Sequence, residues 1–467
     1  MATTGKKLRV LLIPFFATSH IGPFTDLAVC LATASPDVAV EATLAVTPAN
    51  VPLVESLLLQ RVTANVKVAT YPFPAVDGLP QGVENLGKAA PADAWRINAA
   101  AMNEALMRPA QEALIRAQAP HAVVTDVHFL WNAGIAAELG VPCITFHVIG
   151  AFSTLAIRHI IDVVDNGADS VVVPRFPAPG IRIPRSELPE FLRSPRPATD
   201  DRFYSTLADS FGLVVNTSSD MERQYCEMYL RNGYVKRAYF VGPLMLRSSP
   251  QPPAAGDSSR RCMEWLDAKP SRSVVYLCFG SFAHVPDAQL DELALGLEAS
   301  GRAFLWVVRA AGHWSPPEGW EDRVRDMGMM VTTWAPQTAI LGHPAVGAFV
   351  THCGWNSVLE TVVAGVPVLT WPMVFEQFIT ERLLTEVLGI GERLWPGKRS
   401  TRHEENEAIP AQAVASALTA FMRPGGPLKL ARSRVMDLAA KVHAAMADGG
   451  SSRCDLRRLV DDLMDGR

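Results

Sequence analysis

The sequence has little excess charge of either sign, and this argues against a nucleic-acid-binding protein. Its 467 residues carry 43 Lys and Arg against 47 Asp and Glu, a formal net charge of −4, and the two signs are interspersed. Hydrophobic residues make up 49% and charged residues 19%, a composition of folded globular proteins and outside the disordered range. At roughly 100–200 residues per domain, the length predicts two or three domains.

The sequence also lacks disulfide, metal-binding and membrane patterns. Its seven cysteines form no CxxC pair and no metal-ligand spacing, which is typical of reduced thiols in a cytosolic protein. The apolar run at residues 8–16 has only strand length, and no small-residue cleavage site follows it, so no signal peptide is expected. No apolar stretch approaches 18 residues. We therefore expect a cytoplasmic chain, a monomer, with neither nucleic acid nor membrane as a partner.

Several catalytic motifs are missing as well. FFATSHIG, and not GxGxxG, follows the first predicted strand, and Gly389-x-Gly391 follows no predicted strand. These two absences argue against a nicotinamide or flavin oxidoreductase. There is no Walker A motif and no nucleophile elbow. No DxD-type carboxylate motif stands where it would hold a divalent metal.

What the chain has instead is strand–helix alternation from end to end. Strands that are buried on both faces appear as continuous apolar runs, and their alternation with helices predicts parallel sheets of α/β class. The predicted strands are residues 8–16, 41–46, 66–71, 121–126, 142–148, 212–216, 239–241, 274–279, 303–308, 330–333, 347–351 and 367–371. The predicted helices are residues 22–34, a segment within 91–117, a segment through 139, 287–299, 355–363, and 427–465 with a break near 449–452.

One segment interrupts this alternation and predicts a domain boundary. Residues 247–261 (RSSPQPPAAGDSSRR) are rich in Pro, Ser, Gly and Ala and have no apolar face. We predict an N-terminal domain of residues 1–246, this linker, a second domain of residues 262–448, and a C-terminal helix of residues 449–467 that packs back on the first. Ligands of doubly wound sheets bind outside the carboxyl ends of the strands. The expected site is therefore the cleft between two facing sheets.

Residues 334–377 hold the densest cluster of unusual side chains. A predicted strand ends in the turn THCGWNS, and a helix then runs until Gly365 and Pro367 end it. Gly354, Asn356 and Ser357 stand at this helix N-terminus, where backbone N–H groups and the helix dipole favour an anion. His352 stands beside the turn as a further donor. This arrangement fits a pyrophosphate.

The same segment offers groups for the other parts of a nucleotide sugar. Trp334 follows another predicted strand, where its indole face can stack on a planar base. Glu360, one turn into the helix, can accept both hydroxyls of a ribose. Glu376 and Gln377 follow the next strand and can bond the hydroxyls of a sugar.

This segment resembles the signature box of plant secondary-product glycosyltransferases, the UDP-dependent family 1 enzymes with the GT-B fold. It is 44 residues long, as that box is, and it carries WAPQ, HCGWNS, GVP and the terminal acid–Gln pair. The resemblance extends to PFFATSHIGPF near the start and GGSS at residues 449–452, and so covers essentially the whole chain. Thr380 departs from the pattern, because Asn is frequent there.

The resemblance implies a role for each matching residue of the donor site. Trp334 would stack on uracil, while the Ala335 backbone and Gln337 would hold the uridine and Glu360 the ribose. The residues implied to contact the phosphates are His352, Asn356 and Ser357, assisted by Ser281. The groups implied to grip the sugar are the Trp355 backbone, Glu376 and Gln377. The Gln that ends the box favours UDP-glucose as the donor.

His20 and Asp126 are the expected catalytic pair. Each follows or ends a predicted strand at its carboxyl end, and such ends can be neighbours in a parallel sheet although the residues lie 106 positions apart. An imidazole can take a proton from an acceptor hydroxyl near neutral pH, and a carboxylate on its other nitrogen would fix the tautomer. The family uses a His–Asp dyad at the matching positions. Four other histidines show no partner pattern and are interpreted as structural or surface residues: His121, His128, His147 and His343.

We therefore expect an inverting glycosyltransferase that moves glucose from UDP-glucose to a small hydrophobic acceptor and forms a β-glucoside. No cofactor and no metal are expected, because helix N-termini and His352 would stabilise the departing diphosphate. The acceptor is expected to be a flavonoid or another phenolic. Loops of the first half are the candidate acceptor walls: residues 15–18, 71–86, 129–131, 147–154 and 191–204. Residues 173–197 are expected to form a solvated loop.

Two other functions remain open from the sequence. C-glucosylation of an electron-rich phenolic ring carbon would use the same base, so the sequence does not separate it from O-glucosylation. A nucleotide-sugar-binding protein without catalysis is a more distant alternative, because both dyad residues are present.

Overall fold

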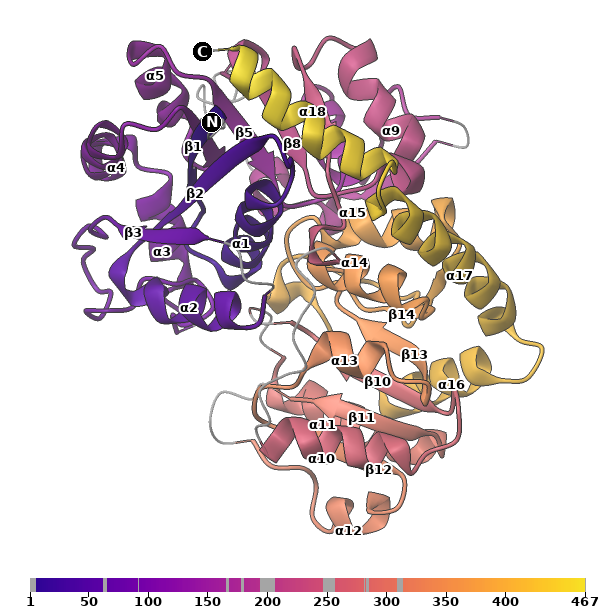
Figure 1. The fold of residues 1–467 in the computed structure, drawn as a ribbon. Helices are drawn as coiled ribbons and strands as arrows, with labels where there is room; N and C mark the ends of the chain where they lie inside the picture. The colour runs from indigo at the N-terminus through magenta and orange to yellow at the C-terminus, as the bar shows by residue number, and fades with distance from the viewer. Residues whose placement is uncertain are drawn as a thin grey trace. The chain divides into compact units, whose positions relative to one another are not determined.

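The chain forms two compact α/β units, each built around one large parallel sheet (Figure 1). The computed structural model describes residues 6–61, 65–90, 92–164, 168–177, 180–193, 206–246, 257–280, 282, 285–308 and 314–466. The first unit comprises Met1–Ala151, Pro197–Ala254 and Val442–Arg467. The second comprises Phe152–Arg196 and Ala255–Lys441.

The first unit contains a seven-stranded sheet in the order β3-β2-β1-β4-β5-β8-β9, and every neighbouring pair is parallel. Its strands are β1 (Lys6–Ile13), β2 (Val38–Val46), β3 (Val66–Thr70), β4 (Ala122–Asp126), β5 (Cys143–His147), β8 (Gly212–Val215) and β9 (Ala238–Phe240). Its helices are α1 (Thr18–Ala32), η1 (Pro48–Asn50), α2 (Val51–Leu59), α3 (Ala94–Ala101), α4 (Glu104–Gln118), α5 (Trp131–Glu138), α9 (Ser219–Arg231), η3 (Leu244–Leu246) and α18 (Ser451–Asp465).

Strand β1 shows how this sheet is buried on both faces. Successive side chains of a strand point to opposite faces, and Leu8, Val10 and Leu12 belong to one hydrophobic cluster whereas Leu11 and Ile13 belong to another. Helices α1, α2 and α18 contribute to the first cluster, and α3, α4 and α5 to the second. Continuous apolar runs such as those of β4 and β5 are therefore explained by helices on each side.

The C-terminal helix α18 packs on this first unit. Its Leu456, Leu459 and Leu463 lie in the same cluster as residues of α1. The hydroxyl of Tyr239 on β9 donates to Asp462 at 2.6 Å, which fixes the helix to the edge of the sheet.

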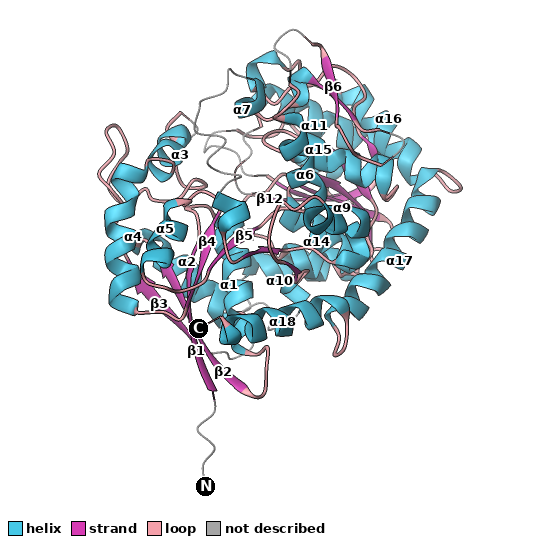
Figure 2. Cartoon of the chain, turned by 90° about the horizontal axis from the view of Figure 1, so that it is seen from above, coloured by secondary structure: helices cyan, strands magenta, loops and turns pink. Residues whose placement is uncertain are grey.

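The second unit contains a six-stranded parallel sheet in the order β12-β11-β10-β13-β14-β15. Its strands are β10 (Val274–Cys278), β11 (Ala303–Val307), β12 (Gly328–Val331), β13 (Val346–Thr351), β14 (Val368–Thr370) and β15 (Gly391–Arg393). Its helices are α10 (Asp257–Asp267), α11 (Asp287–Ser300), α12 (Trp320–Val324), α13 (Gln337–Leu341), α14 (Trp355–Ala364), α15 (Gln377–Arg382), η4 (Leu383–Val387), η5 (His403–Glu405) and α16 (Ala411–Met422). Helix α17 (Pro427–Met446) carries the chain on toward α18. In both units helices enclose the strands (Figure 2).

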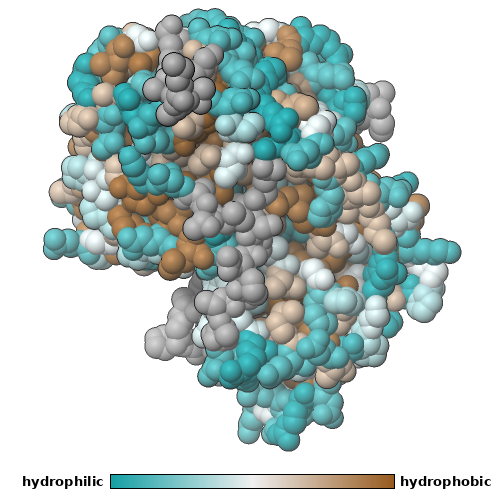
Figure 3. Space-filling view, in the orientation of Figure 1, coloured by the Kyte–Doolittle hydropathy of each residue, from teal (hydrophilic) through white to brown (hydrophobic). Residues whose placement is uncertain are grey.

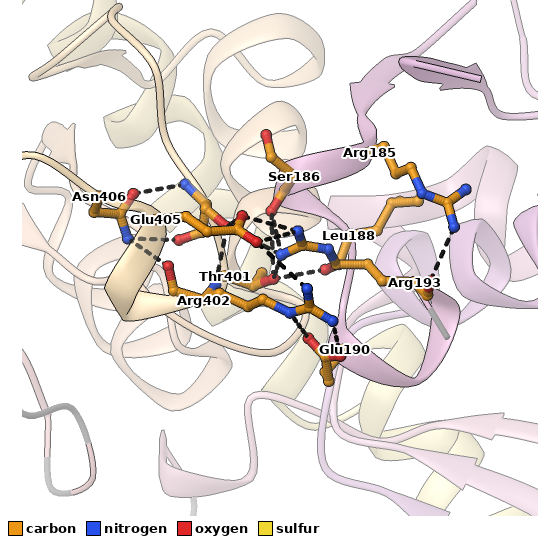
Figure 4. A network of polar contacts seen from close by, with 10 residues as sticks. Arg185, Ser186, Leu188, Glu190, Arg193, Thr401, Arg402, Glu405 and Asn406 are labelled. Atoms are coloured by element: carbon orange, nitrogen blue, oxygen red, sulfur yellow. Dashed lines mark hydrogen bonds and ion pairs between the residues drawn. The ribbon is translucent and has the colours of Figure 1, made fainter. Parts of the chain in front are cut away.

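The segment that follows β5 belongs to the second unit. It contains α6 (Ala151–Ile160), an antiparallel hairpin of β6 (Ser170–Val172) and β7 (Arg182–Pro184), η2 (Arg185–Glu187) and α7 (Glu190–Arg193). Figure 4 shows how ion pairs hold it: Arg193 donates to both carboxylate oxygens of Glu405, at 2.9 and 2.8 Å, and Arg402 pairs with Glu190. The expected solvated loop at residues 173–197 is wrong for β7, η2 and α7, because charged side chains there have partners more than 200 residues away.

Several helices were not predicted, among them α2, α9, α15 and α16, and other differences bear on the site and on the domain boundary. Helix α1 begins at Thr18 and not at residue 22, so His20 lies inside its first turn. The hairpin and the short edge strand β15 were not predicted, because three-residue strands carry little apolar pattern. Helix α10 begins at Asp257, inside the expected linker, whose residues 247–256 lie outside the described part of the chain. Residues 152–196 group with the second unit and not with the first, as the contacts above explain.

The described residues contain no helix that is both long enough and apolar enough to cross a membrane. The face drawn in Figure 3 is mostly hydrophilic, with hydrophobic residues in separate patches.

Candidate functional site

Sheet order brings His20 and Asp126 together in the first unit. Strands β1 and β4 are parallel neighbours, with Ile13 opposite Thr125, so their carboxyl ends lie at the same edge. Asp126 is the last residue of β4. His20 lies in the first turn of α1, where its backbone N–H donates to the Ala17 carbonyl. His20 Nδ1 lies 2.8 Å from Asp126 Oδ2. The residues predicted as a pair are therefore adjacent.

The environment of Asp126 keeps its carboxylate ionised. The side chain is fully buried, and the Phe15 N–H donates to Oδ2 at 3.1 Å. Burial by itself would raise the pKa of this carboxyl, but the electrostatic interaction with His20 and the hydrogen bonds from His128 and His20 hold it well below its ordinary value. An ionised carboxylate accepts the Nδ1–H of His20, which leaves the lone pair of a neutral ring on Nε2. His20 is 17% exposed, so the group is accessible.

His128 is the residue of this site that the sequence interpretation missed. Its Nδ1 lies 2.6 Å from Asp126 Oδ1, and its backbone N–H donates to the same oxygen at 3.3 Å. The interpretation of His128 as a residue without a partner is therefore wrong. A carboxylate that accepts from the backbone two residues on is an Asx turn, which folds the chain back and brings the ring to the carboxylate. The D-x-H spacing was the available signal.

The same three residues are the only group, among those the structure describes, whose ligand atoms come close enough to surround a metal ion. One such atom from each of His20, Asp126 and His128 lies within 4.8 Å of the others. Each imidazole, however, is at hydrogen-bond distance from a carboxylate oxygen, at 2.8 and 2.6 Å. These contacts are hydrogen bonds in which the imidazoles of His20 and His128 each donate an N–H to the Asp126 carboxylate.

In the second unit, Trp334 is placed to present a flat surface. It follows β12, and its side chain is 53% exposed, which is unusual for a Trp in a folded domain. Its backbone carbonyl accepts from the Ser258 hydroxyl at 3.3 Å, so the start of α10 steadies this loop. Ala335 beside it is buried.

Gln337, Ser357 and Glu360 form a connected polar group. The Gln337 amide nitrogen donates to Ser357 Oγ at 2.9 Å and to the Glu360 carboxylate. The Gln337 amide oxygen accepts from the hydroxyl of Tyr276 on β10 at 3.2 Å. Thr338 Oγ1 donates to Glu360 at 3.4 Å. Tyr276 and Thr338 were not predicted, because a Tyr inside the run VVYLC looks like ordinary core.

The turn before α14 holds His352 between two glycines. Gly354 is the N-cap of this ten-residue helix, and Asn356 and Ser357 lie in its first turn. A Cβ on Gly354 would lie 2.4 Å from His352 Nε2, and one on Gly280 would lie 2.7 Å from it, so both positions require glycine. Burial lowers the pKa of His352 to about 4, although a hydrogen bond with the Cys278 backbone acts in the opposite direction and raises it. The ring is therefore neutral at pH 7 and carries a single N–H.

Glu376 and Gln377 lie where the turn after β14 enters α15. Glu376 is the N-cap, and the Gln377 amide oxygen accepts from the N–H groups of Met373 and Val374, at 3.0 and 3.1 Å. The side-chain amide of Gln377 is thereby oriented with its oxygen toward the turn. Thr380, which stands where the family often has Asn, is fully buried and lies 2.9 Å from the Ser153 hydroxyl.

The predicted residues that the structure describes are divided between the two units. His20 and Asp126 lie in the first unit, and the donor-site residues from Trp334 to Gln377, with Trp355 buried among them, lie in the second. Ser281 lies outside the described residues, as do residues 194–204 of one expected acceptor wall.

Known proteins resemble this chain over almost its whole length. Residues 218–391 match the sequence model of the family described as UDP-glucoronosyl and UDP-glucosyl transferase. The chain is 33% identical to UDP-glucose flavonoid 3-O-glucosyltransferase 7 of Fragaria ananassa, over 98% of this chain and 97% of that protein. It is 35% identical to scopoletin glucosyltransferase of Nicotiana tabacum, over 98% of each chain.

Solved structures resemble the whole chain. UGT73P12 of Glycyrrhiza uralensis, crystallised with glycyrrhetinic acid 3-O-monoglucuronide, gives a TM-score of 0.84 at 30% identity and covers 99% of this chain and 96% of its own. UGT71G1 of Medicago truncatula, crystallised with UDP-glucose, gives 0.79 at 25% identity over 99% and 100%. The predicted GT-B class is confirmed, and the chain belongs to the plant family 1 UDP-glycosyltransferases.

Proposed function

We propose that this enzyme transfers glucose from UDP-glucose to a hydroxyl group of a small hydrophobic acceptor, a flavonoid or another phenolic, with inversion at the anomeric carbon. The observation that carries the proposal is the pairing of His20 with Asp126. His20 Nδ1 lies 2.8 Å from Oδ2 of the Asp126 carboxylate, which is fully buried. The relatives named for flavonoid and scopoletin glucosylation support the class of acceptor.

In this mechanism His20 is the general base. Its Nε2 takes the proton of the acceptor hydroxyl while the oxygen forms a bond to the anomeric carbon of glucose. The bond from that carbon to the diphosphate oxygen breaks, and its electron pair leaves with UDP. Asp126 keeps the proton of His20 on Nδ1 and stabilises the imidazolium that forms. Attack opposite UDP converts an α-linked donor into a β-glucoside.

The donor would be held by the second unit without a metal or another cofactor. Trp334 would stack on uracil, the Ala335 backbone and Gln337 would hold the uridine, and Glu360 would bind the ribose. The start of α14, with His352, Asn356 and Ser357, would bind the pyrophosphate through N–H donors and the helix dipole. The Trp355 backbone, Glu376 and Gln377 would bind the sugar. Chelation with EDTA should then leave the rate unchanged, and recovery of a lost rate by added Mg²⁺ or Mn²⁺ would contradict this.

The test of the base is His20→Ala. Transfer, measured as UDP release and as product mass with a panel of phenolic acceptors, should fall at least about 100-fold, the low end for removal of a general base. UDP binding by calorimetry should stay within about twofold, because no donor residue changes. The matched control is His343→Ala, since His343 also lies beside a carboxylate, 3.1 Å from Asp267, but on the second unit. An unchanged turnover of His20→Ala would refute the mechanism.

The linkage is tested on the product. An O-glucoside hydrolyses in hot acid and returns the acceptor, whereas a C-glucoside resists. We expect hydrolysis; an acid-resistant product with cross-ring fragmentation would replace O-transfer by C-transfer with the same base.

A further inference from the structure

The carboxylate of Asp126 serves two imidazoles and not one. His20 lies on Oδ2 and His128 on Oδ1, at 2.8 and 2.6 Å, and one backbone N–H reaches each oxygen, from Phe15 and from His128 itself. A carboxylate has about four lone-pair directions. All four are therefore used by these donors. A dyad would leave Oδ1 with a single backbone partner.

The aromatic contacts hold the rings as one rigid group. Phe15 stacks on His128 with 4.1 Å between ring centroids and 14° between planes, and it meets His20 edge-on at 5.1 Å. The two imidazoles are 5.4 Å apart. Because Phe15 is almost fully buried, it fixes the plane of His128, and His128 in turn fixes the rotation of the carboxylate.

This arrangement has an electrostatic consequence for His20. The stabilisation of an imidazolium on His20 depends on the negative charge that Oδ2 presents. A hydrogen bond from His128 to Oδ1 stabilises the same anion and draws charge from Oδ2. His20 therefore holds a proton less tightly than it would beside a carboxylate without that bond.

Two titratable groups from other elements also interact electrostatically with Asp126. They are Tyr71, which follows β3, and His147, at the end of β5. Burial raises the pKa of Tyr71 and lowers that of His147 to about 4, and the charge of Asp126 acts on both. Neither changes its charge between about pH 5 and pH 9.

We propose that His128 is a positioning residue for the transfer reaction: its Nδ1–H holds the Asp126 carboxylate in line with His20 and lowers the proton affinity of the base. The inference rests on the proposed function, in which His20 is that base. His128 touches neither the acceptor nor the sugar in this role, and acts through Asp126.

The experiment compares two substitutions of His128. His128→Leu removes the donor and keeps apolar bulk beside Phe15. His128→Asn restores an N–H donor close to the position of Nδ1. Both remove the titration of His128 itself, so a difference between them reports the hydrogen bond. The readouts are the pH profile of kcat/KM between pH 5.5 and 9, kcat at the plateau, KM for UDP-glucose, and the thermal midpoint as a check of folding.

For His128→Leu we expect the acidic limb of kcat/KM, which reports the free base, to move up by about 0.5–1 pH unit, since one hydrogen bond to the anion is lost. Plateau kcat should fall about 5- to 30-fold, with KM for UDP-glucose within about twofold. His128→Asn should return the limb to the wild-type position and most of the rate. His343→Ala, which changes a His beside a carboxylate in the second unit, should match the wild type.

Two results would overturn the inference. One is a folded His128→Leu protein whose limb is unmoved and whose rate is within twofold of the wild type. The other is His128→Asn behaving like His128→Leu. His20→Ala, measured beside them, separates this from the proposed function: if His20→Ala is inactive and His128→Leu is normal, only the role of His128 fails, and if His20→Ala is active, the proposed base fails.

Discussion

Replacing Asp126 by Asn tests the catalytic carboxylate most directly. The substitution keeps size and shape but exchanges one acceptor oxygen for an NH2 donor. In the wild type the Asp126 carboxylate accepts from four N–H donors at distances from 2.6 to 3.3 Å. They are the backbone N–H of Phe15, the ring of His20, and the ring and backbone of His128. The single amide oxygen of Asn can accept only from the two donors on its own side, either those of Phe15 and His20 or the two of His128. The imidazole that faces the NH2 group must therefore lose its bond or move its proton to Nε2.

The magnitude follows from this count. Two of the four donors lose a buried acceptor, and each unsatisfied buried group costs about 1–3 kcal/mol, so the free energy of unfolding should fall by about 2–6 kcal/mol at pH 7. If the NH2 group faces His20, the base holds the wrong tautomer, for which losses of about 10⁴ in kcat are known in His–Asp systems. If it faces His128, His20 keeps its tautomer but loses the negative charge that stabilises its imidazolium. We therefore expect a loss of about 10³–10⁴ in kcat/KM, or about 4–5.5 kcal/mol of transition-state stabilisation.

The assay measures turnover by UDP release, UDP affinity by calorimetry and stability by urea unfolding at pH 7. The variant should be folded at 25 °C, should bind UDP within about twofold of the wild type, and should be nearly inactive. A folded Asp126→Asn enzyme with more than a tenth of the wild-type kcat/KM would refute the reasoning, because the tautomer and charge arguments would then both be wrong.

Three further outcomes are expected from other parts of the molecule. Trp334→Ala should weaken UDP binding about 5- to 150-fold, the value of one base-stacking contact, with an almost unchanged thermal midpoint because the side chain is 53% exposed; unchanged affinity in calorimetry would remove Trp334 from the donor site. Glu381→Gln should lower the free energy of unfolding by about 3–5 kcal/mol, since the buried Glu381 pairs with Arg399 at 2.6 Å and Arg393 at 3.2 Å; urea unfolding measures this against Glu264→Gln, whose partner Arg260 is exposed and 3.8 Å away. Burial lowers the pKa of His147 from 6.5 to about 4, so the unfolded chain takes up a proton on this ring at a higher pH than the folded chain does. The free energy of unfolding should therefore fall as the pH falls from 6.5 to about 4, by about 3 kcal/mol in total. Urea unfolding at a series of pH values should show a flatter pH dependence for His147→Phe, and an identical slope would contradict the assignment.

Much of the two sheets could be predicted from the sequence, and burial explains why. Central strands such as β4, β10 and β13 are buried at every residue, so apolar residues predominate in them and make them easy to recognise. The edge strand β15 and the hairpin β6–β7 have three residues in each strand, too few for any periodicity. The start of α1 was placed too late because Thr18 and Ser19 look like turn residues, and the Ala17 N-cap makes no side-chain hydrogen bond that would mark the helix start.

The segment from residue 152 to residue 193 shows a different limit. Within it, the Pro- and Arg-rich composition of residues 173–197 predicts a solvated loop, yet Arg382 is buried with Glu187, and Arg399 bridges Glu187 and Glu381. Each of these acidic residues needs a cation that lies far away in the sequence or on another element. The charge composition indicates that these side chains have partners, but it does not identify the partners. Only the structure shows that this segment belongs to the second unit.

The two candidate groups, one in each unit, differ in how much the sequence could reveal, and the reason is the span of chain that each uses. All predicted donor-site residues except Ser281 lie within 44 consecutive residues, where strand, turn and helix N-terminus follow one another and local spacing predicts the chemistry. The catalytic group joins two segments 106 residues apart, and only the order of β1 and β4 in the sheet makes them neighbours. Its third member, His128, carried no apolar or helical pattern, because a turn onto Asp126 places it and not a face of an element. Local motifs therefore predict the nucleotide-sugar site, whereas the proposed base depends on contacts that only the folded sheet creates.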